Sequence, residues 1–389
     1  MAQRRKLCVV TGSRAEYGLM QRLMRLIDQD DALELQVLAT GMHLSPEFGM
    51  TVRQIEADGF TVNARLEMLL SSDTAVGVTK SMGLGMIGFA DEFQRLAPDV
   101  VVLLGDRFEI LAAAQAAMIA RIPVAHLHGG EKTEGAFDEA IRHAITKMSQ
   151  WHFVAAEEYR QRVIQLGESP DRVFNVGAPG LDLLRDLDWM DREALAASLG
   201  LSLVAPLLLV TYHPATLGDR DPVDALTQLL EALEQFPQAQ VVFTHPNADT
   251  GGRRLIEAID RWVATQGERA RAFASLGQRR YLSLMRLCDV VVGNSSSGLT
   301  EAPALKKATV NIGDRQKGRL KASSIIDASE DSGAIKAALA RALSAEFVGQ
   351  LPGTVSLYGE GEASGLIRDL LKQVSLGSQK TFFDLNHFY

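Results

Sequence analysis

Short runs of Val, Leu and Ile recur along the chain and alternate with stretches of helical periodicity. The runs lack the polar–apolar alternation of half-exposed strands, so they predict strands buried on both faces, as in parallel sheets. Helices between such strands give repeated β–α–β units. The expected strands are residues 7–11, 35–39, 100–104, 124–127, 153–155, 173–176, 207–210, 241–244, 290–292 and 310–312.

The strongest interruption of this pattern is Gly177-Ala178-Pro179-Gly180, and residues 187–201 then predict a bridging helical region. A chain of 389 residues is long enough for two ordinary domains. We therefore predict an α/β fold with two Rossmann-like domains, 1–180 and 181–365, that face each other across a cleft. Residues 366–389 are expected to form a tail that packs back on the first domain.

Charge and composition exclude several classes of protein. A net charge of −8 without a long basic run argues against nucleic acid or an anionic membrane as the main partner. No apolar stretch is long enough for a transmembrane helix, and residues 7–10 are too short for a signal-peptide core. Cys8 and Cys288 lie in apolar contexts, which predicts reduced core thiols and a cytoplasmic protein.

Polar residues beside glycine follow many of the expected strands. In open parallel sheets, ligands bind beyond the carboxyl ends of the strands. A single polar strand end is an ordinary turn, but repeated ends that carry Arg, Asp, Glu and His predict a lined binding cleft. These segments are residues 12–18, 105–107, 128–131, 211–214, 245–247, 293–298 and 313–315.

The segment Gly293-Asn294-Ser295-Ser296-Ser297-Gly298 is the most informative of these strand ends, because a helix is expected from Leu299. Unpaired backbone amides at a helix start can hold an anion, and Gly298 lets a ligand approach the backbone. Glu301, in the expected first turn, suits the hydroxyls of a ribose. These features predict a cradle for a sugar diphosphate with a nucleotide at one end. An ordinary capped helix is the alternative.

Standard nucleotide motifs are missing from the chain. No GxGxxG follows the first expected strand, which argues against a dinucleotide cofactor, and no GxxxxGK[ST] is present for a P-loop. Arg14 opens the first expected helix and either faces a phosphate or is a surface arginine. His213 follows a strand, and Pro214 fixes its loop.

Two acidic residues are candidates for acid–base chemistry. Asp106 ends an apolar strand, where partial burial would raise the pKa of its carboxyl, or else it caps a helix that begins at Phe108. Asp138 begins a helix, where a capping role or a surface ion pair with Arg142 is the alternative.

His126 and His128 share one face of a strand, as a pair of metal ligands would. No Cys, Asp or Glu cluster completes such a site, so we predict no metal. We expect His126 to be a hydrogen-bonded interior histidine, and His128 and Glu131 to reach the cleft.

The motifs, in this order, resemble the hydrolysing UDP-N-acetylglucosamine 2-epimerases of sialic-acid and legionaminic-acid biosynthesis. The resemblance implies a glycosyltransferase-B fold, a homodimer or homotetramer, and chemistry that requires no redox cofactor or metal. The matching segments are residues 11–17, 105–109, 128–131, 138–147, 212–214, 293–298 and 311–316.

The reaction that the resemblance implies begins with removal of the C2 proton of the GlcNAc moiety and elimination of UDP from C1. Water then adds to the resulting 2-acetamidoglucal and gives ManNAc and UDP. Such an elimination needs a general base, worth roughly 10²–10⁴-fold in rate. It also needs groups that stabilise the departing diphosphate, a role that arginine, histidine and helix-start amides fill.

By the same resemblance, Asp106 and Asp138 are the acid–base carboxylates. Many relatives carry a carboxylate where this chain has His128, so His128 or Glu131 takes that role, and His128 also stands where a 4-substituted sugar is recognised. The remaining residues bind the diphosphate, the ribose or other parts of the nucleotide sugar: Arg14, His213, Asn247, Ser295, Ser296, Ser297, Gly298, Glu301 and Arg315.

Three other functions share parts of this pattern: a glycosyltransferase of the same fold, a non-hydrolysing 2-epimerase and a non-catalytic sensor of nucleotide sugars. Several carboxylates beside the sugar favour an epimerase over a transferase or a sensor. The sequence leaves UDP-GlcNAc, UDP-N,N′-diacetylbacillosamine and GDP-GlcNAc open as substrates.

Overall fold

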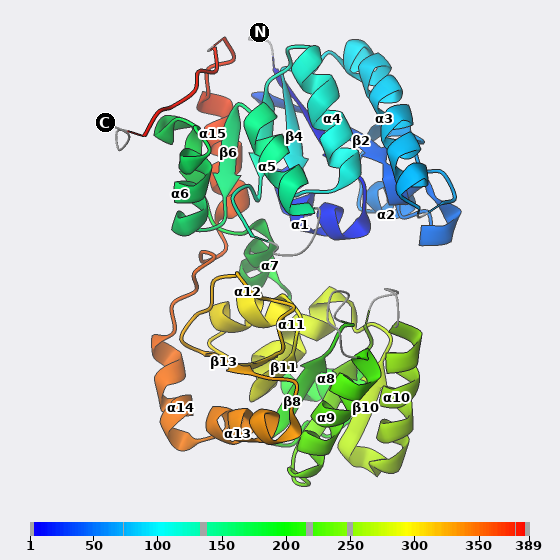
Figure 1. The fold of residues 1–389 in the computed structure, drawn as a ribbon, viewed down its shortest axis with the longest axis vertical. Helices are drawn as coiled ribbons and strands as arrows, with labels where there is room; N and C mark the ends of the chain where they lie inside the picture. The colour runs from blue at the N-terminus through cyan, green and yellow to red at the C-terminus, as the bar shows by residue number, and fades with distance from the viewer. Residues whose placement is uncertain are drawn as a thin grey trace. The chain divides into compact units, whose positions relative to one another are not determined.

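The computed structural model describes residues 4–72, 74–132, 138–214, 221–246, 252–377 and 379–385. The chain forms two compact units (Figure 1). Unit 1 consists of residues 1–183 and 358–389, and unit 2 consists of residues 184–357. The C-terminal segment therefore belongs to the same unit as the N-terminus.

Unit 1 is built on a parallel sheet with the strand order β3-β2-β1-β4-β5-β6-β7. The chain first builds outward from β1 to β3 and then continues on the other side of β1 with β4. At such a switch point the connections leave in opposite directions, which opens a binding crevice at the carboxyl ends of the two strands. The strands are β1 Arg5–Thr11, β2 Leu33–Thr40, β3 Val62–Leu66, β4 Val100–Leu104, β5 Val124–Leu127, β6 Trp151–Val154 and β7 Val173–Asn175.

Helices cover both faces of this sheet. Leu7 and Val9 of β1 pack in a core with α1 and α15, whereas Cys8 and Val10 pack in another core with α3 and α4. This alternation confirms that the apolar runs are strands buried on both faces. The helices are α1 Arg14–Asp28, α2 Val52–Ala57, α3 Ala75–Leu96, α4 Phe108–Ile119, α5 Asp138–Met148, α6 Glu157–Gln165, α7 Asp182–Asp186 and α15 Ala363–Gln373.

Unit 2 repeats this plan with a parallel sheet in the order β10-β9-β8-β11-β12-β13, so its switch point lies between β8 and β11. The strands are β8 Leu207–Thr211, β9 Gln240–Thr244, β10 Ala270–Phe273, β11 Val290–Gly293, β12 Ala308–Ile312 and β13 Ile325–Ala328. The helices are α8 Arg192–Leu199, α9 Pro222–Glu234, α10 Gly252–Thr265, α11 Gly277–Leu287, α12 Ser297–Ala304, α13 Ser332–Ala342 and α14 Ala345–Gln350.

The strand order of both units confirms the predicted Rossmann-like α/β fold. Each of the ten expected strands is present, β4 and β5 with the expected ends and the others with shifted ends, but the sequence missed β3, β10 and β13. These three lie at sheet edges and are only partly buried, so they lack a continuous apolar run. The helical region expected over residues 187–201 is shorter than predicted, since it is reduced to α8.

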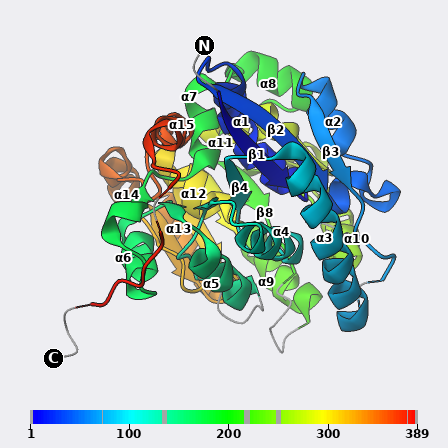
Figure 2. The ribbon, with the colours of Figure 1, turned by 90° about the horizontal axis from the view of Figure 1, so that it is seen from above.

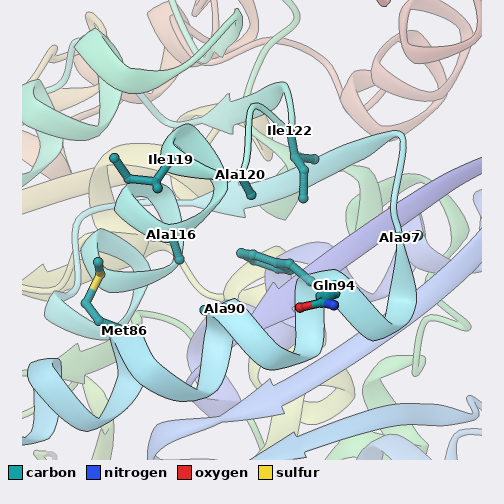
Figure 3. Close-up of a pocket in the computed structure, with 9 residues that line it drawn as sticks. Met86, Ala90, Gln94, Ala97, Ala116, Ile119, Ala120 and Ile122 are labelled. Carbon is teal, nitrogen blue, oxygen red and sulfur yellow. The ribbon is translucent and has the colours of Figure 1, made fainter.

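An apolar groove of about 450 Å³ lies between α3 and α4 of unit 1 (Figure 3). Met86, Ala97 and Ile122 are among its lining residues. Ala97 and Ile122 precede β4 and β5, so the groove lies toward the amino ends of the strands, away from the edge where ligands of such sheets bind. Among the described residues, no helix is long and apolar enough to span a membrane.

Candidate functional site

The carboxyl end of β1 leads directly into the N-terminus of α1 through Gly12 and Ser13. The hydroxyl of Ser13 accepts from the amide of Glu16 (3.4 Å), and Oε2 of Glu16 accepts from the amides of Ser13 (3.0 Å) and Gly12 (2.7 Å). This reciprocal capping box satisfies the first orphan amides of the helix and buries the Glu16 carboxyl. Burial and the neighbouring Glu109 carboxylate raise the pKa of Glu16 to about 7.

Arg107 joins two buried carboxylates at this sheet edge. Its Nε lies 2.8 Å from Oε1 of Glu109 and 3.9 Å from Oε1 of Glu16. Gly12 permits this arrangement, because a Cβ there would lie 2.6 Å from Cγ of Glu109. Asp138, the first residue of α5, is close enough for Arg107 and Glu109 to act on its charge, and partial burial raises the pKa of its carboxyl.

A buried arginine, Arg142 of α5, contacts two more of the predicted acid–base residues, Asp106 through its carboxylate and Glu131 through its main-chain carbonyl. Its Nη2 forms an ion pair with Oδ2 of Asp106 at the end of β4, and its Nη1 donates to the carbonyl of Glu131 (2.8 Å). Oε1 of Glu131 lies 2.6 Å from Nδ1 of His128. The fold thus brings Asp106, Glu131 and His128 together around Arg142, next to the end of β5.

Two alternatives from the sequence are wrong. Asp106 does not cap α4, because Arg107 occupies the N-cap position and makes no capping hydrogen bond through its side chain. Arg142 is buried, so the surface ion pair that its spacing from Asp138 suggested is also wrong. Both residues are turned instead toward the carboxyl edge of the sheet.

The two histidines of β5 and its loop have different surroundings. His126 is fully buried; its Nε2 donates to the carbonyl of Gly105 (2.8 Å) and its Nδ1 faces Oγ1 of Thr146 (3.3 Å). Burial lowers the pKa of His126 to about 3, so the ring is neutral, and the predicted interior histidine is confirmed. His128 has a left-handed backbone (φ 63°), and its Nε2 is buried without a hydrogen-bond partner in the described segments.

In unit 2, a buried asparagine fixes the loop after β8. Oδ1 of Asn294 accepts from the amide of His213 (2.7 Å), and its Nδ2 donates to the carbonyl of His213 (2.9 Å). Arg315 (Nη1, 3.1 Å) and Gln316 (Nε2, 2.9 Å) both donate to the carbonyl of Asn294. Asn294 therefore joins the ends of β8, β11 and β12, and it places His213 and Arg315 at one sheet edge.

The serine cluster begins α12 slightly earlier than expected. Ser296 is the N-cap and Ser297 the first helical residue, so Glu301 lies in the second turn rather than the first. Ser297 contributes hydrogen bonds to the side chains of both Glu301 and Tyr281. Burial raises the pKa of the Glu301 carboxyl and raises that of Tyr281 to about 12.

Gly298 has a packing role within unit 2. A Cβ at Gly298 would lie 2.9 Å from Cγ2 of Thr309, whose hydroxyl donates to the carbonyl of Gly298 (2.8 Å). The missing side chain thus lets α12 pack closely on β12. At Gly293 the backbone lies close to the neighbouring strand β8, because φ is 129° and a Cβ would clash with the carbonyl of Thr211.

Arg14 and Asn247 are the other two residues that the sequence predicted to bind the ligand. Arg14 is exposed at the first position of α1, and within the described part of the chain its guanidinium makes no ion pair. Asn247 lies outside the described residues. The described segments also hold no group of three or more His, Cys, Asp or Glu side chains that is arranged to bind a metal ion.

Several residues at the two edges were missed from the sequence. The capping box of Ser13 and Glu16 was readable from its spacing. Arg142 and Asn294 lie in segments that the sequence singled out, but their contacts gave no local signal, because their partners Asp106 and His213 are distant in the sequence.

The model of the UDP-N-acetylglucosamine 2-epimerase family matches residues 25–372. The chain belongs to this family. It is 42% identical over 324 residues to the GDP/UDP-N,N′-diacetylbacillosamine 2-epimerase (hydrolyzing) of Campylobacter jejuni, which covers 83% of this chain and 84% of the relative. It is 36% identical over 378 residues to the UDP-N,N′-diacetylbacillosamine 2-epimerase (hydrolyzing) of Legionella pneumophila, with 96% and 97% covered. The chain is thus an enzyme of the hydrolysing branch.

Solved structures agree with the fold. The UDP-GlcNAc 2-epimerase of Neisseria meningitidis bound to UDP-GlcNAc superposes with a TM-score of 0.79 at 18% identity, over 94% of this chain and 99% of that one. A UDP-GlcNAc 2-epimerase of Methanocaldococcus jannaschii, in complex with UDP-GlcNAc and UDP, gives a TM-score of 0.74 at 19% identity, over 94% and 99%.

Proposed function

We propose that this enzyme converts a UDP-linked 2-acetamido sugar and water into UDP and the free sugar with inverted C2, through a glycal. The observation that carries the proposal is the grouping of Asp106 and Glu131 around the buried Arg142. Asp138, whose charge interacts with that of Arg107, is the third carboxylate of the proposed acid–base group. A binding protein has no need for several carboxylates gathered beside arginines at one sheet edge, whereas an elimination needs a base, an acid and fixed geometry.

The chemistry requires two proton transfers. A carboxylate takes the C2 proton, the C2–H electrons form the C1=C2 bond, and the C1–O bond breaks with its electrons on the departing UDP. Water then adds its oxygen to C1, and a proton reaches C2 from the opposite face. Asp106 and Asp138 are the proposed acid–base pair. Glu131, hydrogen-bonded to His128, is the proposed partner for hydration, with Nε2 of His128 directed to the sugar.

Unit 2 is the proposed site for the nucleotide. Leaving-group stabilisation needs donors aimed at the β-phosphate, and His213, Arg315 and the amides at the start of α12 are such donors. Ser295, Ser296 and Glu301 provide hydroxyl donors and a carboxylate that suit a diphosphate and a ribose. In unit 1, the exposed Arg14 at the start of α1 is a further proposed phosphate contact.

The proposed sugar is 2-acetamido at C2 and either unsubstituted GlcNAc or a 4-acetamido-4,6-dideoxy relative. Both hydrolysing relatives described above are named for UDP-N,N′-diacetylbacillosamine, which favours the 4-acetamido sugar. A panel of UDP-N,N′-diacetylbacillosamine, UDP-GlcNAc and GDP-GlcNAc, each incubated with enzyme and water alone, identifies the substrate by release of nucleotide and free sugar.

Isotopes test the reaction course. In D₂O the product sugar should carry deuterium at C2, because the proton lost in elimination is replaced from solvent. In H₂¹⁸O the released UDP should remain unlabelled, since C1–O cleavage leaves the bridging oxygen on the nucleotide. Heavy oxygen in UDP would mean attack at phosphorus and would overturn the proposal. A non-hydrolysing epimerase would return an epimerised UDP-sugar, and a glycosyltransferase would release no sugar without an acceptor.

We further propose that the enzyme acts in the cytoplasm as a homodimer or homotetramer. The outer face of α3 and α4 exposes Ile87, Met118 and Ile119 beside the apolar groove, and monomers rarely leave such patches open. Light scattering of the wild type and of Ile119→Arg measures the oligomeric state. A monomeric wild type would reject this part of the proposal.

A further inference from the structure

The C-terminal segment of unit 1 carries a lysine that contacts the carboxyl end of α5. We propose that this residue, Lys380, is a positioning residue for the acid–base site: it holds the end of α5, and α5 in turn holds Asp138 and Arg142. The inference rests on the proposed function, since it explains how the carboxylates of that reaction are kept in place.

Lys380 caps the C-terminal end of α5, although it does not belong to that helix. Its Nζ donates to the carbonyls of Lys147 (2.8 Å) and Ser149 (2.7 Å), and the carbonyl of Thr146 lies at 3.4 Å. The last carbonyls of an α-helix have no partner within the helix and form the negative end of its dipole. An ammonium group at this place satisfies these oxygens and is favoured by the dipole.

The same ammonium group neutralises a buried carboxylate. Nζ of Lys380 lies 2.7 Å from Oε2 of Glu168, which also accepts from His152 (2.9 Å), while Lys147 bonds the other oxygen (2.6 Å). Burial alone would raise the pKa of Glu168, but these three partners outweigh it and lower the pKa to about 2. Glu168 is therefore ionised. A buried carboxylate is stable in this form only when charged or hydrogen-bonding partners compensate for its loss of water.

The segment around Lys380 is seated on unit 1 by further contacts. The amide of Phe383 donates to the carbonyl of Gly167 (2.9 Å), and a Cβ at Gly167 would lie 2.3 Å from the ring of Phe382. Arg172 donates to the carbonyl of Gln379 (3.1 Å). Figure 2 shows this segment running past α6. These contacts hold the C-terminal segment on unit 1 and place Lys380 beside the end of α5.

Two paths connect α5 with the reacting carboxylates. Arg142 binds Asp106 and the carbonyl of Glu131, as described above. One turn further along the helix, Thr146 contacts His126, whose other nitrogen donates to the carbonyl of Gly105, the residue before Asp106. A shift of α5 would therefore move Asp106 by two routes, and displacements of about 1 Å can reduce turnover by about 10²-fold.

The test replaces Lys380 in the full-length enzyme by Met, which keeps the length of the side chain and removes its charge. We expect kcat to fall about 10-fold or more, with KM and the thermal shift produced by UDP close to wild type. Amide hydrogen exchange over residues 138–149 should become faster. Lys380→Arg, which retains a donor and a charge, should recover most of the kcat.

Lys372→Met is the matched control. Lys372 lies on α15 of the same unit, and among the described residues its Nζ donates to one carboxylate, Oδ2 of Asp30 (2.8 Å), away from α5. Its loss should leave kcat and exchange of α5 unchanged. Lys147→Met removes one partner of Glu168 but leaves the bonds of Lys380 to the helix end, so its effect on kcat should be smaller than that of Lys380→Met.

Three results would overturn the inference, and the first two are a Lys380→Met enzyme with normal kcat, whatever its melting temperature, and a loss of kcat without faster exchange in α5. An equal loss in the Lys372→Met control would also overturn it. Exchange needs no substrate, so the link from Lys380 to α5 is tested even by an enzyme that converts no nucleotide sugar. An enzyme that converts no nucleotide sugar would contradict the proposed function and would leave the link from Lys380 to α5 open to the exchange test.

Discussion

The carboxyl edges of the two sheets have the same topology but opposite chemistry. In unit 1 the edge is dense in charge, with carboxylates held by the buried or half-buried Arg107 and Arg142. In unit 2 the edge consists of amides, hydroxyls, His213 and Arg315 arranged around Asn294. One strand order can therefore position either a group of carboxylates or a group of hydrogen-bond donors, and the residues that follow the strands decide which.

This difference matches a division of labour in the proposed reaction. Proton transfer needs groups that change charge, and these need fixed counter-charges nearby to set their pKa and position. Recognition of a diphosphate needs donors that stay fixed while charge develops on the ligand. We expect substitutions in unit 1 to act on kcat and substitutions in unit 2 to act on nucleotide affinity, and the four predictions below test this expectation.

Asp106→Asn should have the largest effect. The change keeps the shape of the side chain but removes the titratable carboxylate, so kcat should fall at least about 10²-fold while UDP binding stays normal. Asp182→Asn is the control, because Asp182 is a buried carboxylate of unit 1 that accepts from the amides of Ala363 (2.9 Å) and Ser364 (2.6 Å) at the start of α15. Near-normal turnover of the Asp106→Asn variant would mean that Asp106 is not one of the acid–base groups.

Asn294→Ala should act on the nucleotide side. It removes the two hydrogen bonds from the Asn294 side chain to the main chain of His213, so the loop that carries His213 is held less firmly and the Kd for UDP should rise about 10-fold. Titration calorimetry measures this. Asn311→Ala removes another buried asparagine of the same sheet, whose Nδ2 donates to Asp327 (2.8 Å), and should keep UDP affinity. Equal losses of UDP affinity in both variants would mean that Asn294→Ala acts through general destabilisation of unit 2 and not through His213.

Glu301→Ala belongs to the same comparison and should weaken the stabilisation by UDP. Ligand that binds only the folded state raises its melting temperature, and the rise depends on Kd. We expect a smaller rise for Glu301→Ala than for wild type at millimolar UDP, with kcat at saturating substrate less affected. If neither UDP nor GDP raises the melting temperature of the wild type, the nucleotide site in unit 2 is wrong.

Glu16→Gln tests the electrostatics of unit 1 through stability. The pKa of Glu16 is raised from its ordinary value of 4.5 to about 7, so its stabilising contribution is full below about pH 4.5 and is lost as pH rises through about 7. Removing the titratable group should therefore flatten the pH dependence of the free energy of unfolding between these values, by roughly 2–3 kcal/mol. Urea unfolding at pH 5 and pH 8 measures it, and an unchanged dependence would contradict the burial argument.

The sequence predicted the interior of the fold better than its margins. Central strands such as Val100–Leu104 and Val290–Gly293 are continuous apolar runs, because helices cover both of their faces. The edge strands Val62–Leu66 and Ala270–Phe273 carry mixed residues, because one side is open, and they were missed. The start of α12 was misplaced slightly, since helix-capping residues such as Ser296 and Ser297 can stand on either side of a boundary.

The amino-acid sequence by itself determined the fold class and the family motifs, because the alternation of buried runs and polar strand ends is a local pattern. It also identified Asp106 and Glu131, which follow expected strands, and Asp138, which begins an expected helix, as candidates, because such positions can be recognised from neighbouring residues. Only the tertiary structure decided their partners. Arg142 meets Asp106 and Asn294 meets His213 because parallel strands bring the ends of distant segments to one edge. Such contacts depend on the order of strands in the sheet, which no short stretch of sequence encodes.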